Sequence, residues 1–305
     1  MPQEDRAPPD RFAAMGEPGI PDLRHSSGAV ALTRDVLVVQ GPDALAFLQG
    51  QLSQDVEGLT IGSSAPSLLL QPTGKVDAWL RATRSADDEV VLDVEVGWGD
   101  VVAARLRRFL LRTKATLEPA RWTGVALRGP GSLDAVVEGG QRLRVAWPGV
   151  EGIDVLGPDG VTLAAPLEPH EALEALRIVS GVPTMGAEIT EATIPAELGQ
   201  WLIDESVSFT KGCYTGQELV ARIDSRGGKV PRPVRGLRLA EGVAPAGAAV
   251  TLDGAEVGRV TSSALSPELG PVALATLARS VVPGAVVQVA GTEGEQAATV
   301  AEPPL

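Results

Sequence analysis

Short apolar blocks, separated by glycine and proline turns, make up most of the chain. Residues 36–39 are an uninterrupted apolar run, which is typical of a buried strand. After the turn at Gly41 and Pro42, Asp43 is a favourable helix N-cap. The helix that it predicts has apolar residues at helical spacing, namely Leu45, Leu48, Leu52 and Val56. Further strands are predicted over residues 67–71, 76–83, 89–96 and 113–118, and a helix begins at Asp100.

The same succession of strand, Gly-Pro turn and helix begins again at residue 125. An apolar strand over residues 125–127 runs into Gly129-Pro130-Gly131, and Leu133 opens the predicted helix. This repetition hints at two related α+β halves. From residue 234 the sequence pattern changes to short β-rich stretches between turns such as Asp253-Gly254. This pattern predicts a small all-β domain. We therefore divide the chain into a flexible Pro-rich segment (1–25), an α+β region (26–233) and a β domain (234–305).

Composition excludes several classes of function. The 39 Asp and Glu residues outnumber the 26 Lys and Arg residues and give a net charge of −13, which disfavours general nucleic-acid binding. One cysteine and two histidines offer no internal disulfide and no familiar metal site, so no metal is expected. The Pro-rich start does not resemble a signal peptide, and no apolar run approaches the roughly 20 residues of a membrane helix. We expect a cytoplasmic protein that does not bind membranes.

The only cysteine and the only tyrosine are neighbours, in the octet Lys-Gly-Cys-Tyr-Thr-Gly-Gln-Glu at residues 211–218. A lone cysteine is most often a small buried hydrophobe. Here its neighbours are polar residues or glycines, and Lys211 offers a charge that would favour the thiolate of Cys213. We predict a short strand over residues 207–209 before the octet, which places the thiol at a turn.

Two basic stretches stand out in this acidic chain. Residues 222–238 contain six cations, namely Arg222, Arg226, Lys229, Arg232, Arg235 and Arg238, against the single acid Asp224. This island is either a solvated loop or an anion site, since arginine suits carboxylates and phosphates. The second stretch runs from Arg105 to Lys114 across a predicted helix end, where cations favour the helix dipole, and we interpret it as structural.

The octet, with Val220-Ala221-Arg222 after it, resembles the signature of the YgfZ-like folate-binding proteins, relatives of the glycine-cleavage T-protein. Further segments match in the same order, at residues 41–52, 72–76, 177–183, 194–197 and 258–262. The resemblance implies an α+β fold, a T-protein-like ring of two ferredoxin-like α+β segments plus a C-terminal β-barrel around a central folate channel.

The resemblance also implies a function. Such a protein would bind tetrahydrofolate or a one-carbon derivative and serve iron–sulfur protein maintenance or tRNA modification, with iron–sulfur proteins or their assembly factors as partners. Cys213, with Lys211 and Tyr214, would carry the chemistry. The cofactor would be bound by Glu197, Gln217, Glu218, Arg222, Arg226 and Arg232.

The chain departs from the family pattern at two places. T-proteins carry an Asp-Asp pair where this chain has Ala78-Trp79; Asp77 is one position early, and nothing in the sequence signals a bulge that would shift it. Some YgfZ-type proteins place tryptophans against folate where this chain has Arg34 and Leu173, so we expect a different pocket wall. Two alternatives stay open: a folate-dependent aminomethyltransferase, and a non-catalytic folate-gated adaptor.

Overall fold

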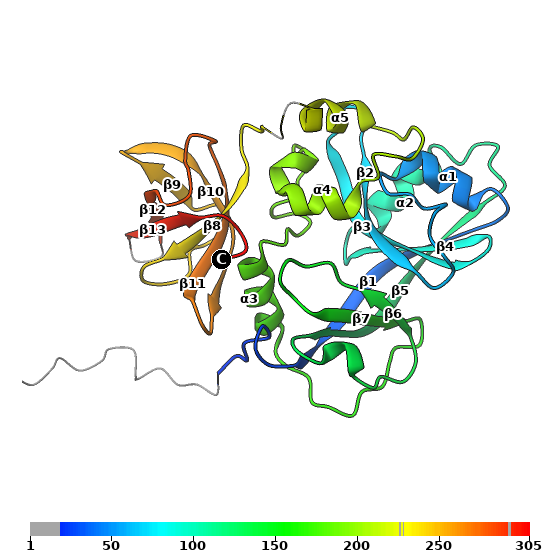
Figure 1. The fold of residues 1–305 in the computed structure, drawn as a ribbon, viewed down its shortest axis with the longest axis horizontal. Helices are drawn as coiled ribbons and strands as arrows, with labels where there is room; N and C mark the ends of the chain where they lie inside the picture. Colours follow the sequence, from blue (N-terminus) through cyan, green and yellow to red (C-terminus); the bar gives the residue numbers. More distant parts are fainter. Residues whose placement is uncertain (1–18, 226, 228, 292–293) are drawn as a thin grey trace, which may run out of the picture.

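The computed structural model describes residues 19–225, 227, 229–291 and 294–305, and it consists of one large antiparallel sheet and one closed barrel (Figure 1). The sheet has the order β2-β3-β4-β1-β5-β7-β6. Its strands are β1 (Gly28–Gln40), β2 (Ser64–Leu70), β3 (Val76–Ala86), β4 (Glu89–Glu95), β5 (Thr116–Arg128), β6 (Gln141–Arg144) and β7 (Gly152–Gly157). The helices are α1 (Ala44–Gln51), α2 (Gly99–Arg107), α3 (His170–Ser180), α4 (Gln200–Ser206) and α5 (Gln217–Ser225), with 3₁₀ turns at Ser132–Asp134 and Pro195–Leu198.

The long strands β1 and β5 pair along the whole of β1 and tie the two parts of the sheet together. At one end of this ladder Gly41 follows β1, and a Cβ there would lie 2.4 Å from the Lys114 carbonyl oxygen, just before β5. At the other end Gly129 follows β5, and a Cβ there would lie 2.2 Å from the Ser26 carbonyl oxygen, just before β1. Both glycines have positive φ, so each turn needs the backbone freedom that only glycine has. The two Gly-Pro turns seen in the sequence thus occupy equivalent positions.

A β-bulge interrupts the pairing of β2 with β3 at Asp77. Leu69 pairs with Ala78, but Leu70 pairs with Val76, which leaves Asp77 as the extra residue. Asp77 consequently faces α2, where its carboxylate accepts a hydrogen bond from Arg105 Nε at 3.1 Å. Nothing in the sequence signals this bulge, so the expected register of Asp77 was wrong.

The barrel has the order β10-β11-β8-β13-β12-β9 and a core of its own. Its strands are β8 (Val234–Leu239), β9 (Ala249–Leu252), β10 (Ala255–Ser266), β11 (Gly270–Leu277), β12 (Val286–Ala290) and β13 (Glu295–Ala301). Helix α3 lies between the barrel and the sheet (Figure 1). A second contact comes from Ser262 of β10, whose hydroxyl donates to buried Glu188 at 2.6 Å.

The predicted α+β class with a C-terminal barrel is confirmed. Two local predictions are wrong. Residues 207–209 are not a strand, because α4 ends at Ser206 and the chain then turns along α1. The helix predicted at Leu133 is a single 3₁₀ turn. Of the segment predicted to be flexible, residues 1–18 lie outside the described residues, while Leu23 is buried. Within the described residues, no helix is both long and apolar enough to cross a bilayer.

Candidate functional site

The octet forms the loop between α4 and α5, and Lys211 fastens it to the end of α1. The Lys211 ammonium donates to the carbonyl oxygens of Gln49, Leu52 and Gln54 at 2.6, 2.7 and 2.9 Å. Burial lowers the pKa of Lys211 to about 8, so the group remains charged at pH 7. An ammonium has three donors. All three are therefore taken up by carbonyls, which assigns Lys211 a structural role that the sequence did not reveal.

Two glycines bring the octet against the β2–β3 turn. Gly216 has φ +83°, and a Cβ on it would lie 2.5 Å from the carbonyl oxygen of Gln71. Gly74 has φ +81°, and its Cβ would lie 2.4 Å from the Cβ of Leu219 in α5. Neither contact leaves room for a side chain. Three segments that carry the family resemblance, namely the end of α1, the β2–β3 turn and the octet, thus meet at one place.

Within the octet, the predicted residues differ in exposure. Cys213 is a free, exposed thiol. Tyr214 is half-buried against the main core, and burial raises the pKa of its phenol to about 12. The side-chain carbonyl of Gln217 accepts from the Tyr214 N–H at 3.3 Å, and Glu218 is exposed. Cys213 is accordingly the reactive group that the loop presents to solvent.

The other predicted cofactor residues lie elsewhere. Glu197 is half-buried in the 3₁₀ turn before α4; burial raises the pKa of its carboxyl, and Arg232 lies near enough to act against that rise. Arg232 and Arg222 are exposed, and Arg226 lies outside the described residues. The structure places Glu197 near Arg232 but brings neither of them to the large cavity described next.

A cavity of about 370 Å³ lies between the sheet, α3 and residues 182–184. Five arginines line it, Arg34, Arg81, Arg128, Arg144 and Arg177, together with the indoles of Trp79 and Trp147. The size falls within the roughly 300–1,000 Å³ of small-molecule pockets. None of the residues predicted for catalysis or cofactor binding lines it, whereas Arg34 and Leu173, predicted to alter the pocket wall, both do.

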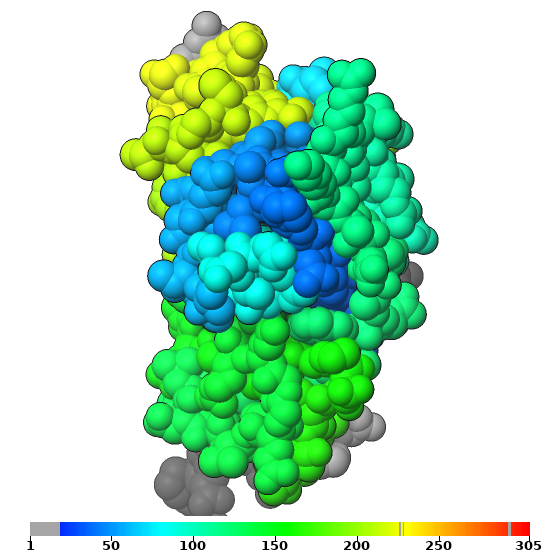
Figure 2. Space-filling view, turned by 90° about the vertical axis from the view of Figure 1, so that its right-hand side faces the viewer, coloured from blue at the N-terminus to red at the C-terminus, as the bar shows by residue number. Residues whose placement is uncertain are grey.

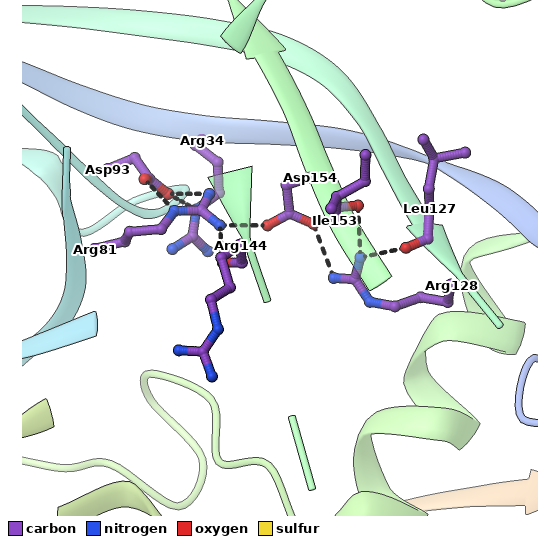
Figure 3. Close-up of polar contacts among 8 residues, drawn as sticks. All are labelled: Arg34, Arg81, Asp93, Leu127, Arg128, Arg144, Ile153 and Asp154. Atoms are coloured by element: carbon purple, nitrogen blue, oxygen red, sulfur yellow. Dashed lines mark hydrogen bonds and ion pairs between the residues drawn. The ribbon is translucent and has the colours of Figure 1, made fainter. Parts of the chain in front are cut away.

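Buried charges form a ladder along the cavity wall (Figure 3). Asp93 is bound by Arg34 Nε at 2.9 Å and by Arg81 Nε at 2.8 Å. Asp154 is bound by Arg81 at 2.9 Å and by Arg128 at 2.8 Å. Burial by itself would raise the pKa of Asp154, but Arg128 and Arg81 outweigh it and hold the pKa below its usual value. Within this ladder three guanidinium groups face two carboxylates, and the acid Glu95 lines the same cavity.

Comparison with known proteins places this geometry in a family. The model of the glycine cleavage T-protein C-terminal barrel domain matches residues 232–305. The tRNA-modifying protein YgfZ of Edwardsiella ictaluri is 28% identical over 214 residues, 62% of this chain and 64% of that protein. The iron-sulfur cluster assembly factor IBA57 homolog of Neurospora crassa is 26% identical over 249 residues, 73% of this chain and 56% of that protein.

A crystal structure supports the same fold. The glycine cleavage system aminomethyltransferase T from Bartonella henselae matches with a TM-score of 0.73, over 93% of this chain and 87% of that chain, at 21% identity. The barrel model and the relatives named YgfZ and IBA57 support a YgfZ-like member of the glycine-cleavage T-protein superfamily, and the solved structure shows the same fold. The resemblance predicted from the octet is confirmed. The chain spans less than two thirds of the length of the YgfZ and IBA57 relatives, so their activities enter below as a proposal.

In this YgfZ-like chain the end of α4 connects the cavity with the octet. Trp79, on the cavity wall, donates from its indole to the Ser206 hydroxyl at 3.0 Å, and Ser53 donates to the Ser206 carbonyl at 2.6 Å. Glu205 pairs with Arg144 at 2.8 Å and accepts from the Gln54 amide through its carbonyl, also at 2.8 Å. Residues 53–54 thus touch both α4 and the carbonyl cradle of Lys211.

The sequence contains a signal for the charge ladder that we did not use in the prediction, namely single charged residues within apolar strands. Arg81, Asp93 and Asp154 each interrupt an otherwise apolar stretch of strand. Buried charged residues are rare unless they are paired, so charges in three apolar strands indicate a buried network. What the sequence could not show is that these strands face one cavity.

Among the described residues, one cluster of potential metal ligands lies at the surface, and its contacts do not indicate a metal centre. The carboxylates of Asp22 and Glu268 and the ring of His25 lie within 4.8 Å of one another at the surface. Arg24 forms ion pairs with both carboxylates, at 3.3 and 2.6 Å. A cation would compete with this guanidinium for the same oxygens, so the cluster is better explained as a surface ion-pair network.

Proposed function

We propose that this protein binds tetrahydrofolate or a one-carbon derivative in the central cavity. The observation that carries the proposal is the charge ladder: a wall of three guanidinium groups beside two indoles suits an anionic aromatic ligand. Folates combine a ring system with carboxylates at the opposite end. The superfamily fold supports this assignment.

The cavity residues fit such a ligand. The Arg128 Nε is buried without a hydrogen-bond partner among the described residues, and its guanidinium lies 4.6 Å from the centre of the Trp147 ring. Arg34 gives only its Nε to Asp93, so its terminal nitrogens are available for a carboxylate. Glu95 is a half-buried acid on the same wall, able to accept a ring N–H. The bound cofactor would supply a carrier for one-carbon units.

We further propose that the protein acts through Cys213 in iron–sulfur protein maintenance or tRNA modification. Relatives named as an iron-sulfur cluster assembly factor and as tRNA-modifying proteins support this function. The octet supports it too, because the loop is fixed by Lys211 and two glycines yet leaves the thiol exposed. A fixed loop with one exposed nucleophile suits contact with a partner protein.

Two alternatives rest on specific features. The structural likeness to an aminomethyltransferase favours aminomethyl transfer, but Asp77 is bound to Arg105 and does not line the cavity. We therefore propose that the chain does not catalyse that reaction. The other alternative is a folate-gated adaptor in which the thiol is dispensable. It would predict full function after Cys213→Ser.

Calorimetric titration with tetrahydrofolate and 5-formyltetrahydrofolate tests the cavity. Arg34→Gln removes one guanidinium from the cavity wall while Asp93 keeps both bonds to Arg81, so the variant should fold. One lost charge-assisted bond should raise Kd about tenfold. The matched control is Arg121→Gln, an ion-paired arginine of β5 outside the cavity, which should bind as the wild type does. Absence of binding by any reduced folate would sink the cavity proposal.

Complementation tests the thiol separately. A strain lacking the protein is supplied with the wild type or with Cys213→Ser, and the activity of an iron–sulfur enzyme and the level of modified tRNA are measured. We expect the wild type alone to restore them. Full restoration by Cys213→Ser would support the adaptor instead.

A further inference from the structure

The turn between α2 and β5, residues 107–114, combines exposed apolar and cationic side chains. Leu111 is 84% exposed and Phe109 is 44% exposed. Four exposed cations surround them, Arg107, Arg108, Arg112 and Lys114. None of the four forms an ion pair with any residue that the structure describes. In a chain of net charge −13, this turn is a local concentration of positive charge around two large apolar groups.

Backbone and side-chain contacts hold the turn in shape. The N–H groups of Phe109, Leu110 and Thr113 donate to carbonyls within the turn at 3.0–3.3 Å. The Arg105 guanidinium lies 4.5 Å from the centre of the Phe109 ring and is itself fixed by Asp77 and by the Leu70 carbonyl. An aromatic side chain fixed in this way loses little freedom on binding. The exposed groups are therefore preorganised.

The turn is linked to the Cys213 loop through two buried residues, Arg105 and Leu70. Arg105 reaches the Leu70 carbonyl at 3.1 Å, and a Cβ on Gly216 would lie 2.8 Å from the Leu70 Cβ. At its other end the turn touches the start of α1, where the Lys114 N–H donates to Asp43 at 2.8 Å. Figure 2 shows residues around 105–120 (blue-green), α1 (blue) and the chain around 210–225 (yellow-green to yellow) on one face.

We propose that the 107–114 turn docks an acidic protein partner, one that presents carboxylates around an apolar side chain, and so directs that partner to the face that carries Cys213. Arginine and aromatic residues are enriched where protein interfaces gain most of their affinity, and three of the four cations are arginines. Leu111 and Phe109 offer an exposed apolar surface between the cations, which a protein side chain can cover and a phosphate backbone cannot, so the turn suits an acidic protein better than RNA. The proposal does not depend on what the cavity binds.

A defined peptide tests the chemistry of the surface. The probe is a fluorescent helical peptide whose glutamates flank a leucine and a phenylalanine, and its control carries glutamine for every glutamate. We expect the full-length protein to bind the acidic probe at least about tenfold tighter than the control. Arg107→Gln with Arg108→Gln, or Leu111→Ser, should weaken binding about tenfold with an unchanged melting temperature, because these side chains are exposed. The control variant is Val136→Ser, at 82% exposure, which should have no effect.

Photo-crosslinking in cells tests the partner. A photoreactive phenylalanine analogue replaces Leu111 or, as the matched control, Val136. We expect position 111 to give a discrete protein adduct whose crosslinked peptide is acidic, with a yield that falls on Arg107→Gln with Arg108→Gln. Four outcomes would overturn the proposal: equal binding of both peptides, no adduct specific to position 111, an adduct with a neutral or basic peptide, or stronger binding to bulk tRNA or to phosphatidylserine vesicles than to the probe.

Discussion

Replacing Lys211 by methionine should lower the free energy of unfolding by about 2 kcal/mol at pH 7. The change keeps most of the aliphatic stem but leaves the carbonyls of Gln49, Leu52 and Gln54 without their donor. Hydrogen bonds to charged groups contribute about 1.5–3 kcal/mol each where buried. Lys211 is only half-buried and water can rehydrate part of the cradle, so the total is discounted to roughly 2 kcal/mol.

Two measurements separate a structural lysine from one that activates the thiol. Urea unfolding followed by circular dichroism gives the loss of stability, and an unchanged m-value would show that the unfolding transition itself is unaltered. The rate of alkylation of Cys213 by iodoacetamide, measured against pH, gives the midpoint of thiolate formation. We expect the midpoint to stay at its wild-type position, because the three carbonyls already offset much of the ammonium charge. Lys229→Met, at an exposed lysine, is the control.

The opposite pattern would refute this reasoning. Unchanged stability of Lys211→Met, together with an alkylation midpoint moved to higher pH, would show that the ammonium stabilises the thiolate and that the carbonyl cradle contributes little.

Three further predictions concern the cavity wall and the octet. The lowered pKa of Asp154 means that its ion pairs stabilise the fold above about pH 4 and are lost as the pH falls through the folded-state pKa. Asp154→Asn should therefore destabilise the protein at pH 7 and make its stability less dependent on pH in the acid range. Burial raises the pKa of Glu95, so the folded state binds a proton more tightly than the unfolded state, and stability falls as the pH rises above 4.5. Glu95→Gln keeps an acceptor for Thr184 and Met185 and should remove that loss of stability. Thermal melts between pH 4 and 8 would show it. Gly216→Ala should cost about 1–3 kcal/mol because of its positive φ and its contact with Gln71, whereas Gly212→Ala, with open space around its Cβ, should be neutral in the same melts.

Local chemistry in the sequence determined several elements of this fold. The run at residues 36–39 and the N-cap region at Asp43 predicted the end of β1 and the start of α1. Gly181 is a typical residue for a helix end, and it terminates α3 with φ +72°. The Asp253-Gly254 turn joins β9 to β10 with both residues at positive φ. These predictions were correct because strand burial, helix termination and tight turns depend on neighbours a few residues apart.

The candidate site also has a part that local sequence predicts and a part that only tertiary structure determines. The octet was visible as a motif, and its exposed thiol sits on a turn as predicted. Its anchoring was not visible, because the Lys211 cradle belongs to residues about 160 positions earlier in the chain. Charge alone suggested that Lys211 favours the thiolate of Cys213, whereas packing against the end of α1 decided where its donors point.

The cavity was decided by tertiary structure alone. The charge ladder unites three arginines and two aspartates from five different strands, so no local pattern contains it. The bulge at Asp77 likewise depends on how β2 pairs with β3, and pairing register is set by the buried faces of both strands together. The sequence identifies the charged residues, but only the packing of the sheet against α3 determines that they border one cavity. Buried charges are paired with residues that are close in space, and these residues can be far apart along the chain.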